Sequence, residues 1–244
     1  YYSQLGDLIK ARESIIDALN SNPEDPQVNL YAARLYYQMK DKENAQRFAR
    51  TTIDLAPSSM ISEEARYFYS RIMSGITEEE QMLNRDLFLE AINKMKKRDM
   101  ESAINVLESV LTIEPYYWRA WFLKGVGLRT LARYEEALTA FDKVDELFED
   151  QVSLHHEIGK CHMGMENFQK AFGHILYAFK NRPQEPEIMG NMAIVYMYLG
   201  RLEESEVLFT QLKKTAPGFR NIDVYMNELK KLKKRKKSSR GNGC

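Results

Sequence analysis

Apolar side chains recur along this chain at intervals of three and four residues, in stretches separated by polar or Pro- and Gly-containing segments. One such stripe consists of Ile222, Tyr225, Met226 and Leu229. This spacing places the apolar residues on one face of an α-helix. Strict alternation of apolar and polar residues, which is typical of β-strands, is not a notable feature of the sequence. The pattern therefore predicts an all-α protein.

Prolines mark a regular period in this pattern. Pro23 and Pro57 are 34 residues apart, as are Pro183 and Pro217, and Pro115 precedes Pro183 by twice that distance. Each proline follows an apolar-periodic stretch, where a residue that cannot continue a helix ends it. A period of this length indicates stacked helical hairpins, because one hairpin cannot bury its apolar face alone.

Residue size follows the same period when each proline is set at position 32 of a 34-residue unit. Small residues occupy positions 8 and 20 of the complete units: Ala33, Ala91, Gly125, Gly159 and Ala193, and Ala45, Ala103, Ala137, Ala171 and Ser205. Mostly bulkier residues occupy position 24: Ala49, Leu107, Phe141, Ile175 and Phe209. We expect the small residues where the two antiparallel helices of a hairpin come closest, because only a small side chain fits there.

The sharpest stretch of the repeat is Trp121, Gly125, Tyr134, Ala137 and Phe141, which follows the pattern W-x2-L-G-x2-Y and then A-x3-F. Here the chain resembles the tetratricopeptide repeat (TPR) family. Three positions depart from the family pattern: Lys124, Leu128 and Glu149. The resemblance implies a right-handed α-solenoid of stacked antiparallel helical hairpins, which is mostly a curved surface for holding other molecules.

The period divides the chain into five complete repeats and four other segments. The repeats are expected at 26–59, 84–117, 118–151, 152–185 and 186–219. Residues 1–25 are expected to form the second helix of a repeat whose first helix is missing, because Ala11, Ile15 and Pro23 take positions 20, 24 and 32. The other three segments are an inserted helix with an irregular linker at 60–83, a capping helix at 220–237 and the disordered end of a basic tail at 238–244.

The insertion at 60–83 has helical spacing of its own and is expected to close at Ser74 and Gly75. Thr77 and Glu80 then form a predicted capping box, which starts the next helix about six residues before its repeat begins. Two interpretations of the insertion remain open. It is either a degenerate half-repeat or a break in superhelical pitch that separates two binding surfaces.

Residues suited to catalysis or metal binding are scarce. The four histidines, His155, His156, His162 and His174, lie in one unit with Cys161. His155 and His162 share a helix face, but they take packing positions of the repeat, so we expect partly buried imidazoles rather than a metal site. Gly125 and Gly127 form a G-x-G in mid-helix with no preceding strand, which does not indicate a nucleotide site. The sequence predicts a non-catalytic chain without a metal or cofactor.

A binding groove is the stronger prediction. In this fold the first helices of successive hairpins line the concave face, and here they bring aromatic, methionine and aliphatic side chains with scattered cations, which interface cores favour. The predicted groove comprises Arg34, Tyr37, Phe88, Met95, Arg119, Phe122, Arg129, His156, Lys160, Asn191, Ile194, Met197 and Tyr198. Gly164 and Gly190 are expected to leave space for a side chain of the partner. Alternatively, part of this stripe is hairpin core, or a neighbouring element or a second copy of the chain fills the groove.

Charge is unevenly distributed, although 35 basic residues balance 35 acidic ones. Eight of the basic residues lie in 230–240, where there is no acidic residue, so residues 1–229 have a net charge of −8. They are Lys230, Lys231, Lys233, Lys234, Arg235, Lys236, Lys237 and Arg240. Such a run is either a solvated helix end that suits the helix dipole, or a contact for nucleic acid or an acidic lipid or protein surface.

These observations predict a protein-interaction scaffold or adaptor that binds a helical or extended peptide of a partner within a multiprotein complex. Two alternatives are association with nucleic acid or an acidic surface through the tail, and the solenoid part of a larger enzyme. Cys161 and Cys244 do not suggest a disulfide framework, and no apolar stretch approaches the roughly 20 residues that cross a bilayer. We expect an intracellular protein of the cytoplasm, or of the nucleus if the basic run is an import signal.

Overall fold

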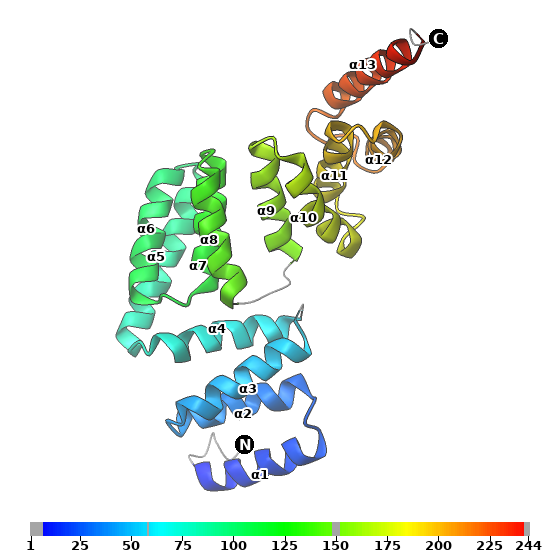
Figure 1. Cartoon of the computed structure of the whole chain (residues 1–244). Coiled ribbons are helices and arrows are strands. Elements are labelled where there is room, and N and C mark those ends of the chain that lie inside the picture. The colour runs from blue at the N-terminus through cyan, green and yellow to red at the C-terminus, as the bar shows by residue number, and fades with distance from the viewer. Residues whose placement is uncertain (1–6, 58, 148–151, 242–244) are drawn as a thin grey trace. The chain divides into compact units, whose positions relative to one another are not determined.

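The computed structural model describes residues 7–57, 59–147 and 152–241, with side chains described as far as Arg235. This part of the chain consists of α-helices and turns, without a strand (Figure 1). In chain order the helices are α1 (Leu8–Ser21), α2 (Pro26–Gln38), α3 (Lys42–Leu55), α4 (Met60–Ser74), α5 (Glu78–Lys96), α6 (Met100–Ile113), α7 (Trp118–Thr130), α8 (Tyr134–Leu147), α9 (Val152–Gly164), α10 (Phe168–Asn181), α11 (Pro186–Tyr198), α12 (Leu202–Thr215) and α13 (Ile222–Gly241). The predicted all-α helical-repeat fold is confirmed. No helix in the described ranges is both long enough and apolar enough to cross a membrane.

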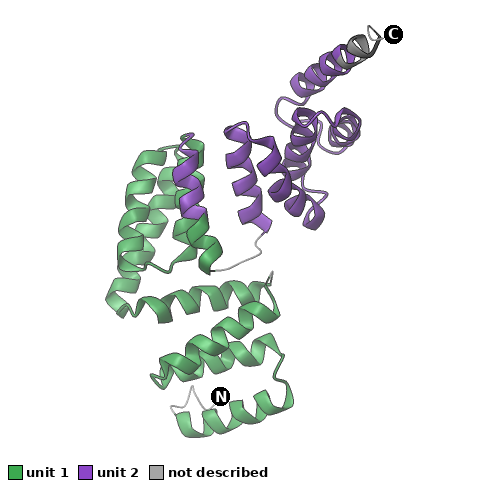
Figure 2. Cartoon of the chain, in the orientation of Figure 1, with its two compact units in different colours: residues 1–131, 142–151 green, residues 132–141, 152–244 purple. Residues whose placement is uncertain are grey.

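The chain forms two compact units (Figure 2). Unit 1 comprises residues 1–131 and 142–151, and unit 2 comprises residues 132–141 and 152–244, so the boundary falls inside α8. Within unit 1, α2 packs on α3 and α5 on α6, while in unit 2 α9 packs on α10 and α11 on α12. Each unit has its own buried apolar clusters, as expected for hairpins that bury their faces against neighbours.

Side chains of the preceding residues cap many of the helices. Asp25 begins α2 by accepting hydrogen bonds from the backbone N–H groups of the first turn, and Pro26 follows at a position that needs no donor. The predicted capping box is confirmed at α5. Thr77 Oγ1 accepts from the Glu80 backbone N–H at 3.2 Å, and the Glu80 carboxylate accepts from the Thr77 N–H at 2.8 Å. As the box predicts, α5 begins at Glu78, six residues before the repeat at 84.

The hairpin turns share one backbone conformation. Lys40, Arg98, Ala132, Glu166 and Gly200 occupy equivalent positions of successive repeats, and all have φ between 58° and 74°. A residue in this left-handed region ends a helix by turning the next N–H back toward the last carbonyls. The N–H of the residue after Lys40 accordingly donates to the Tyr36 carbonyl at 2.9 Å, and the turns at Arg98, Glu166 and Gly200 repeat this bond. Only Gly200 among the five lacks a side chain.

Small residues lie at the hairpin contacts, as the sequence predicts. All ten residues at positions 8 and 20 are buried. A Cβ atom built on Gly159 of α9 would lie only 2.5 Å from Cδ1 of Ile175 on α10. In the last hairpin the Ser205 hydroxyl donates to the Ala193 carbonyl at 2.8 Å, directly across the two helices. The close approach therefore depends on side-chain size at these positions.

The inserted helix α4 packs against α3 and α2 and ends at Gly75, which has φ 65°. Its Ser70 hydroxyl donates to the buried carboxylate of Glu114, at the end of α6. The Asn84 amide of α5 donates to the other oxygen of the same carboxylate at 3.0 Å. Burial raises the pKa of Glu114, and these two hydrogen bonds oppose that shift. The insertion is thus fixed to the following hairpin by a buried polar network.

Helix α13 covers the last hairpin. Ile222 and Leu229 are buried against α12, and the Tyr225 ring stacks on Phe209 with centroids 5.9 Å apart. The helix continues through Gly241 rather than ending near 237, because no proline or glycine interrupts it before that residue. The expected disordered end at 238–244 is therefore wrong for 238–241, while 242–244 lie outside the described residues.

Candidate functional site

A cleft of about 480 Å³ opens in unit 2 between α9, α11 and α13. Its walls combine apolar and aromatic side chains with one amide and one carboxylate. The lining residues are Met163, Gly164, Glu166, Phe168, Asn191, Ile194, Tyr198 and Tyr225. Three of the predicted groove residues, Asn191, Ile194 and Tyr198, meet in this cleft. Their spacing on α11 places them on one face of the helix, one turn apart.

Asn191 is held in place by a histidine beneath it. Its Nδ2 lies 2.8 Å from Nε2 of His156, which is buried on α9. The amide donates and the imidazole nitrogen accepts in this arrangement, which requires a neutral ring. Burial lowers the pKa of His156, and the nearby positive charge of Lys160 lowers it further. Both effects favour the form that orients the Asn191 amide at the cleft.

Tyr198 forms an exposed aromatic wall. Its ring stacks on Phe168 at 4.3 Å between centroids, with 13° between the planes, yet 47% of Tyr198 remains exposed. The Tyr198 hydroxyl donates to Oε1 of Glu228 on α13 at 3.3 Å. Burial, and then the Glu228 charge, raises the pKa of Tyr198, so the phenol stays protonated at neutral pH. The wall is therefore flat, partly apolar and tied to α13.

The other predicted residues of unit 2 lie beside or beneath the cleft. Lys160 donates to Glu157 and to Glu187, each at 2.8 Å, and so joins α9 to the start of α11. Met197 is only 1% exposed and belongs to the core, which agrees with the alternative that part of the stripe is hairpin core. Met197 lies about 100° around α11 from Tyr198 and about 120° from Asn191, so it packs into the hairpin while they line the cleft.

The two glycines expected to leave space for a partner are covered by rings of the chain itself. A Cβ on Gly190 would lie 2.3 Å from Cζ of Phe219, and one on Gly164 would lie 2.4 Å from Cζ of Tyr134. Gly190 therefore offers no opening, and the expectation is wrong for it. Gly164 still borders the cleft, but the space over its Cα belongs to Tyr134.

Sequence reasoning missed four of the lining residues as members of the site. Glu166 is in the left-handed turn, Phe168 begins α10, and Tyr225 lies on the stripe by which α13 packs. Met163 belongs to α9, a first helix of a hairpin, but it is not among the predicted groove residues. A turn residue and a capping-helix residue have no fixed place in the repeat pattern, so periodicity alone cannot assign them to the cleft.

In unit 1, the predicted groove residues of α2, α5 and α7 pack mostly on neighbouring side chains. Tyr37 meets the Phe68 ring edge-on at 5.1 Å, and the Phe88 ring lies 4.8 Å from that of Tyr117. Both residues are partly buried against apolar clusters. Three further members are also partly buried: Met95, Phe122 and Arg129.

The inserted helix α4 supplies partners for two predicted groove arginines of unit 1. Arg34 of α2 forms an ion pair with Glu64, and Arg119 of α7 lies 3.6 Å from the Glu63 carboxylate. The sequence did not indicate these contacts, since α4 is outside the repeat period. Because adjacent residues of one helix contact α2 and α7, α4 lies between the predicted groove segments of those helices.

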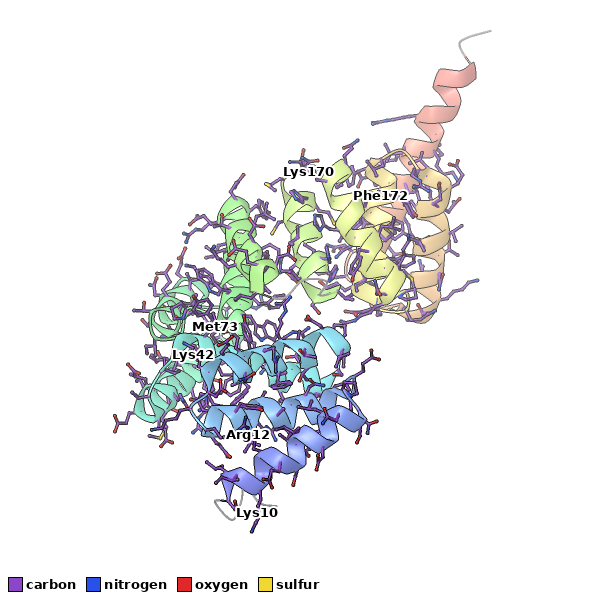
Figure 3. All side chains as sticks on the ribbon, turned by 60° about the horizontal axis from the view of Figure 1, so that its bottom comes forward. Lys10, Arg12, Lys42, Met73, Lys170 and Phe172 are labelled. Carbon is purple, nitrogen blue, oxygen red and sulfur yellow. The ribbon has the colours of Figure 1, made fainter. Side chains whose placement is uncertain are left out.

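Three of the histidines gather on a different face of unit 2, over a depression of about 470 Å³ between α9 and α10. Nδ1 of His155 lies 2.9 Å from Nδ1 of His174, and the His162 ring is 5.9 Å from that of His174. Burial, and then Lys170 (labelled in Figure 3), lowers the pKa of His162. Among the residues whose placement is described, no three His, Cys, Asp or Glu side chains are arranged to hold a metal ion. Cys161 is buried in α9, and Cys244 lies outside the described residues.

The basic tail has two distinct sides on α13. Lys233 donates to Glu206 of α12 at 2.6 Å, so this cation is paired with an acidic residue of the last hairpin. Lys230, Lys231, Lys234 and Arg235 are exposed. The side chains of Lys236, Lys237 and Arg240 lie outside the described residues. The described contacts do not point to nucleic acid.

Sequence comparison identifies tetratricopeptide repeats in two parts of the chain. The tetratricopeptide repeat profile matches residues 27–59 and 88–151. Over 45 residues the sequence is 42% identical to an uncharacterized protein of Methanocaldococcus jannaschii. That match covers 18% of this chain and 52% of the archaeal protein, so it spans about half of the relative's length.

Solved structures resemble the fold at low sequence identity. Pseudomonas aeruginosa PilF has a TM-score of 0.51 at 15% identity, covering 93% of this chain and 92% of its own. The Cut9–Hcn1 hetero-tetramer of the APC/C contains a chain with a TM-score of 0.55 at 12% identity, covering 93% of this chain and 47% of that one. At such identities the likeness concerns the arrangement of helices alone.

Proposed function

The chain belongs to the tetratricopeptide-repeat superfamily, and on that premise we propose that it is a non-catalytic interaction scaffold whose second unit binds a segment of a partner protein in the α9–α11–α13 cleft. The observation that carries this proposal is the cleft itself, where an apolar wall and one oriented amide converge. One structural neighbour is a chain of the Cut9–Hcn1 hetero-tetramer of the APC/C, which supports the proposal of a role in a multiprotein complex.

The occupant that suits the cleft is a peptide segment with one apolar or aromatic anchor. Met163 offers an adaptable thioether surface and Tyr198 a flat ring for the anchor to pack on, while Ile194, which is only 7% exposed, contributes a small apolar part of the lining. The Asn191 amide donates to His156, so its carbonyl oxygen Oδ1 is the group that would accept from a backbone N–H of the segment. A few such anchors supply most of the affinity in this kind of interface.

A binding role also suits the chemistry of the lining. Met163, Glu166 and the aromatic and aliphatic side chains include no Ser, Cys or Lys nucleophile paired with a base. The one histidine nearby, His156, lies beneath Asn191 and is committed to orienting it. We therefore assign binding, and not turnover, to this cleft.

Peptides displayed on phage, selected on the purified chain, test the proposal. We expect recovered peptides to share one apolar or aromatic residue, and Tyr198→Ala to weaken their binding about tenfold or more, a hot-spot effect. Tyr31→Ala is the matched control, because Tyr31 is similarly exposed (51% against 47%) but lies on α2 of unit 1. Circular dichroism of each variant checks that the helices persist.

Hydrogen exchange of the wild-type chain supplies a second, mutation-free measurement. Bound peptide should slow exchange in α9, α11 and α13 and leave α2 and α3 unchanged. If recovered peptides bind equally well to the Tyr198→Ala chain and protect other helices, the cleft is not the binding site. If selection recovers no specific peptide, the scaffold role of this cleft is refuted.

A further inference from the structure

Helix α13 borders the cleft and also has a surface of its own. A depression of about 520 Å³ runs along one flank of the helix, lined by Val224, Asn227, Glu228, Lys231, Leu232 and Arg235. Four of these residues, at 224, 228, 231 and 235, recur every three or four positions and therefore form one stripe. This stripe was absent from the predicted groove, because the repeat pattern ends before α13.

The stripe is distinct from the face by which α13 packs. Ile222 and Leu229 are buried against the last hairpin, and Lys233, which is one turn after Leu229, bonds Glu206 of α12. At 100° per residue, Lys231 and Arg235 lie well over 90° around the helix from Leu229. Their charges are thus directed away from the acidic residue that holds Lys233.

The stripe is continuous with the cleft. Tyr225 lines the cleft, and Glu228, at the edge of the stripe, accepts the hydrogen bond of the Tyr198 hydroxyl. Lys231 and Arg235 follow Glu228 by three and seven residues, which is about 4.5 and 10.5 Å along the axis. A peptide that leaves the cleft past Tyr198 therefore reaches both cations within a few residues of its anchor.

We propose that the flank of α13 bearing Lys231 and Arg235 binds acidic side chains of the partner segment whose apolar anchor occupies the cleft. This inference rests on the proposed function and specifies the partner as an acidic peptide. Charge complementarity supports it, because residues 230–240 contain eight basic and no acidic residues. Arg and Lys beside an apolar pocket give such a peptide its direction along the site.

The composition of the stripe favours a peptide over a nucleic acid. The depression also contains Val224, Asn227 and Leu232, and it has no aromatic side chain on which bases would stack. The phosphate backbone of a nucleic acid would bind the cations on every flank of α13 without preference. An acidic peptide anchored in the cleft would use only the flank beside it.

Charge reversal on the two flanks of α13 provides a matched test. The first variant carries Lys231→Glu and Arg235→Glu on the cleft side, and the control carries Lys230→Glu and Lys234→Glu on the opposite flank. Both pairs are exposed, lie on the same helix and change the net charge equally. The probe is the tightest displayed peptide that depends on Tyr198, synthesised with a fluorescent label, and a single-stranded oligonucleotide serves as the second probe.

We expect the probe peptide to contain Asp or Glu on one side of its anchor and to bind the first variant about tenfold or more weakly, with the control within about twofold. Affinity of the wild type should also fall with added salt. Binding equal in both variants, or a probe without acidic residues, overturns the inference while the Tyr198 dependence keeps the proposed function. Equal loss in both variants, with the oligonucleotide also bound, assigns the tail to general electrostatic contact instead. If no Tyr198-dependent peptide exists, both proposals fall.

Discussion

Replacing Gly159 by alanine tests the hairpin contact on which the fold depends. The added Cβ would lie 2.5 Å from Cδ1 and 2.7 Å from Cγ1 of Ile175, and 3.3 Å from its backbone nitrogen. Ile175 is fully buried, so its side chain has little room to move away. Either the side chain leaves its rotamer or α9 and α10 separate.

The magnitude follows from two opposing effects. Overpacking a core contact costs about 1–3 kcal/mol, whereas alanine in place of glycine inside a helix contributes about 1 kcal/mol of stability. Gly173→Ala in α10 isolates the second effect, because a Cβ there meets no atom within 4 Å. We therefore expect the Gly159 variant to be about 1–3 kcal/mol less stable than the Gly173 variant.

Urea unfolding followed by circular dichroism measures this difference, with hydrogen exchange of α9 and α10 to localise it. Ile175→Val removes Cδ1, so the Gly159→Ala and Ile175→Val double variant should lose less stability than the two single variants together, by about 1 kcal/mol. A Gly159→Ala chain as stable as Gly173→Ala would refute the close contact. It would also refute the repeat register that places Gly159 at the helix crossing.

Other perturbations test groups buried in the fold. Leu229→Ala should lower the free energy of unfolding by about 2–5 kcal/mol, because it removes a buried side chain. Amide hydrogen exchange should become faster in α11 and α12 but not in α2 and α3, since each repeat contacts only its neighbours. An equal increase of exchange in all of these helices would contradict this expectation. The lowered pKa of His156 favours its neutral form in the fold, so stability should be complete above about pH 6.5 and fall on acidification below it. His156→Gln should flatten this pH dependence of the urea midpoint, and an unchanged slope would exclude His156 as its source. Glu114→Ala leaves two buried donors without an acceptor and should cost about 1–3 kcal/mol, against under about 1 kcal/mol for exposed Glu108→Ala; equal losses would show that the network is not stabilising.

The sequence predicted the fold well because its signals are local and repeated. The small residues at positions 8 and 20 recur in every complete repeat, and all of them are buried. The capping box at Thr77 and the stop at Gly75 depend on residues adjacent in sequence, and both are present. The predicted end of the capping helix near 237 was too early, since α13 continues without a proline or glycine as far as Gly241.

The site was only partly predictable, because side chains from outside the period complete it. Periodicity identified Asn191, Ile194 and Tyr198, which share one face of α11. It could not show that Tyr225 of the capping helix lines the cleft, or that Phe219 covers Gly190. These contacts join segments whose separation in sequence follows no repeat, so only the three-dimensional arrangement reveals them.

The left-handed hairpin turns help to explain how chains with this fold can differ widely in sequence. In five turns the residue at this position has φ between 58° and 74°, and these residues are Lys40, Arg98, Ala132, Glu166 and Gly200. Since glycine alone adopts this conformation without strain, packing of the two flanking helices imposes the turn on whatever residue occupies it. Substitutions at these positions therefore alter stability slightly while the phase of the array persists. Such tolerance is one physical reason why chains with 12–15% identity retain a comparable helix arrangement.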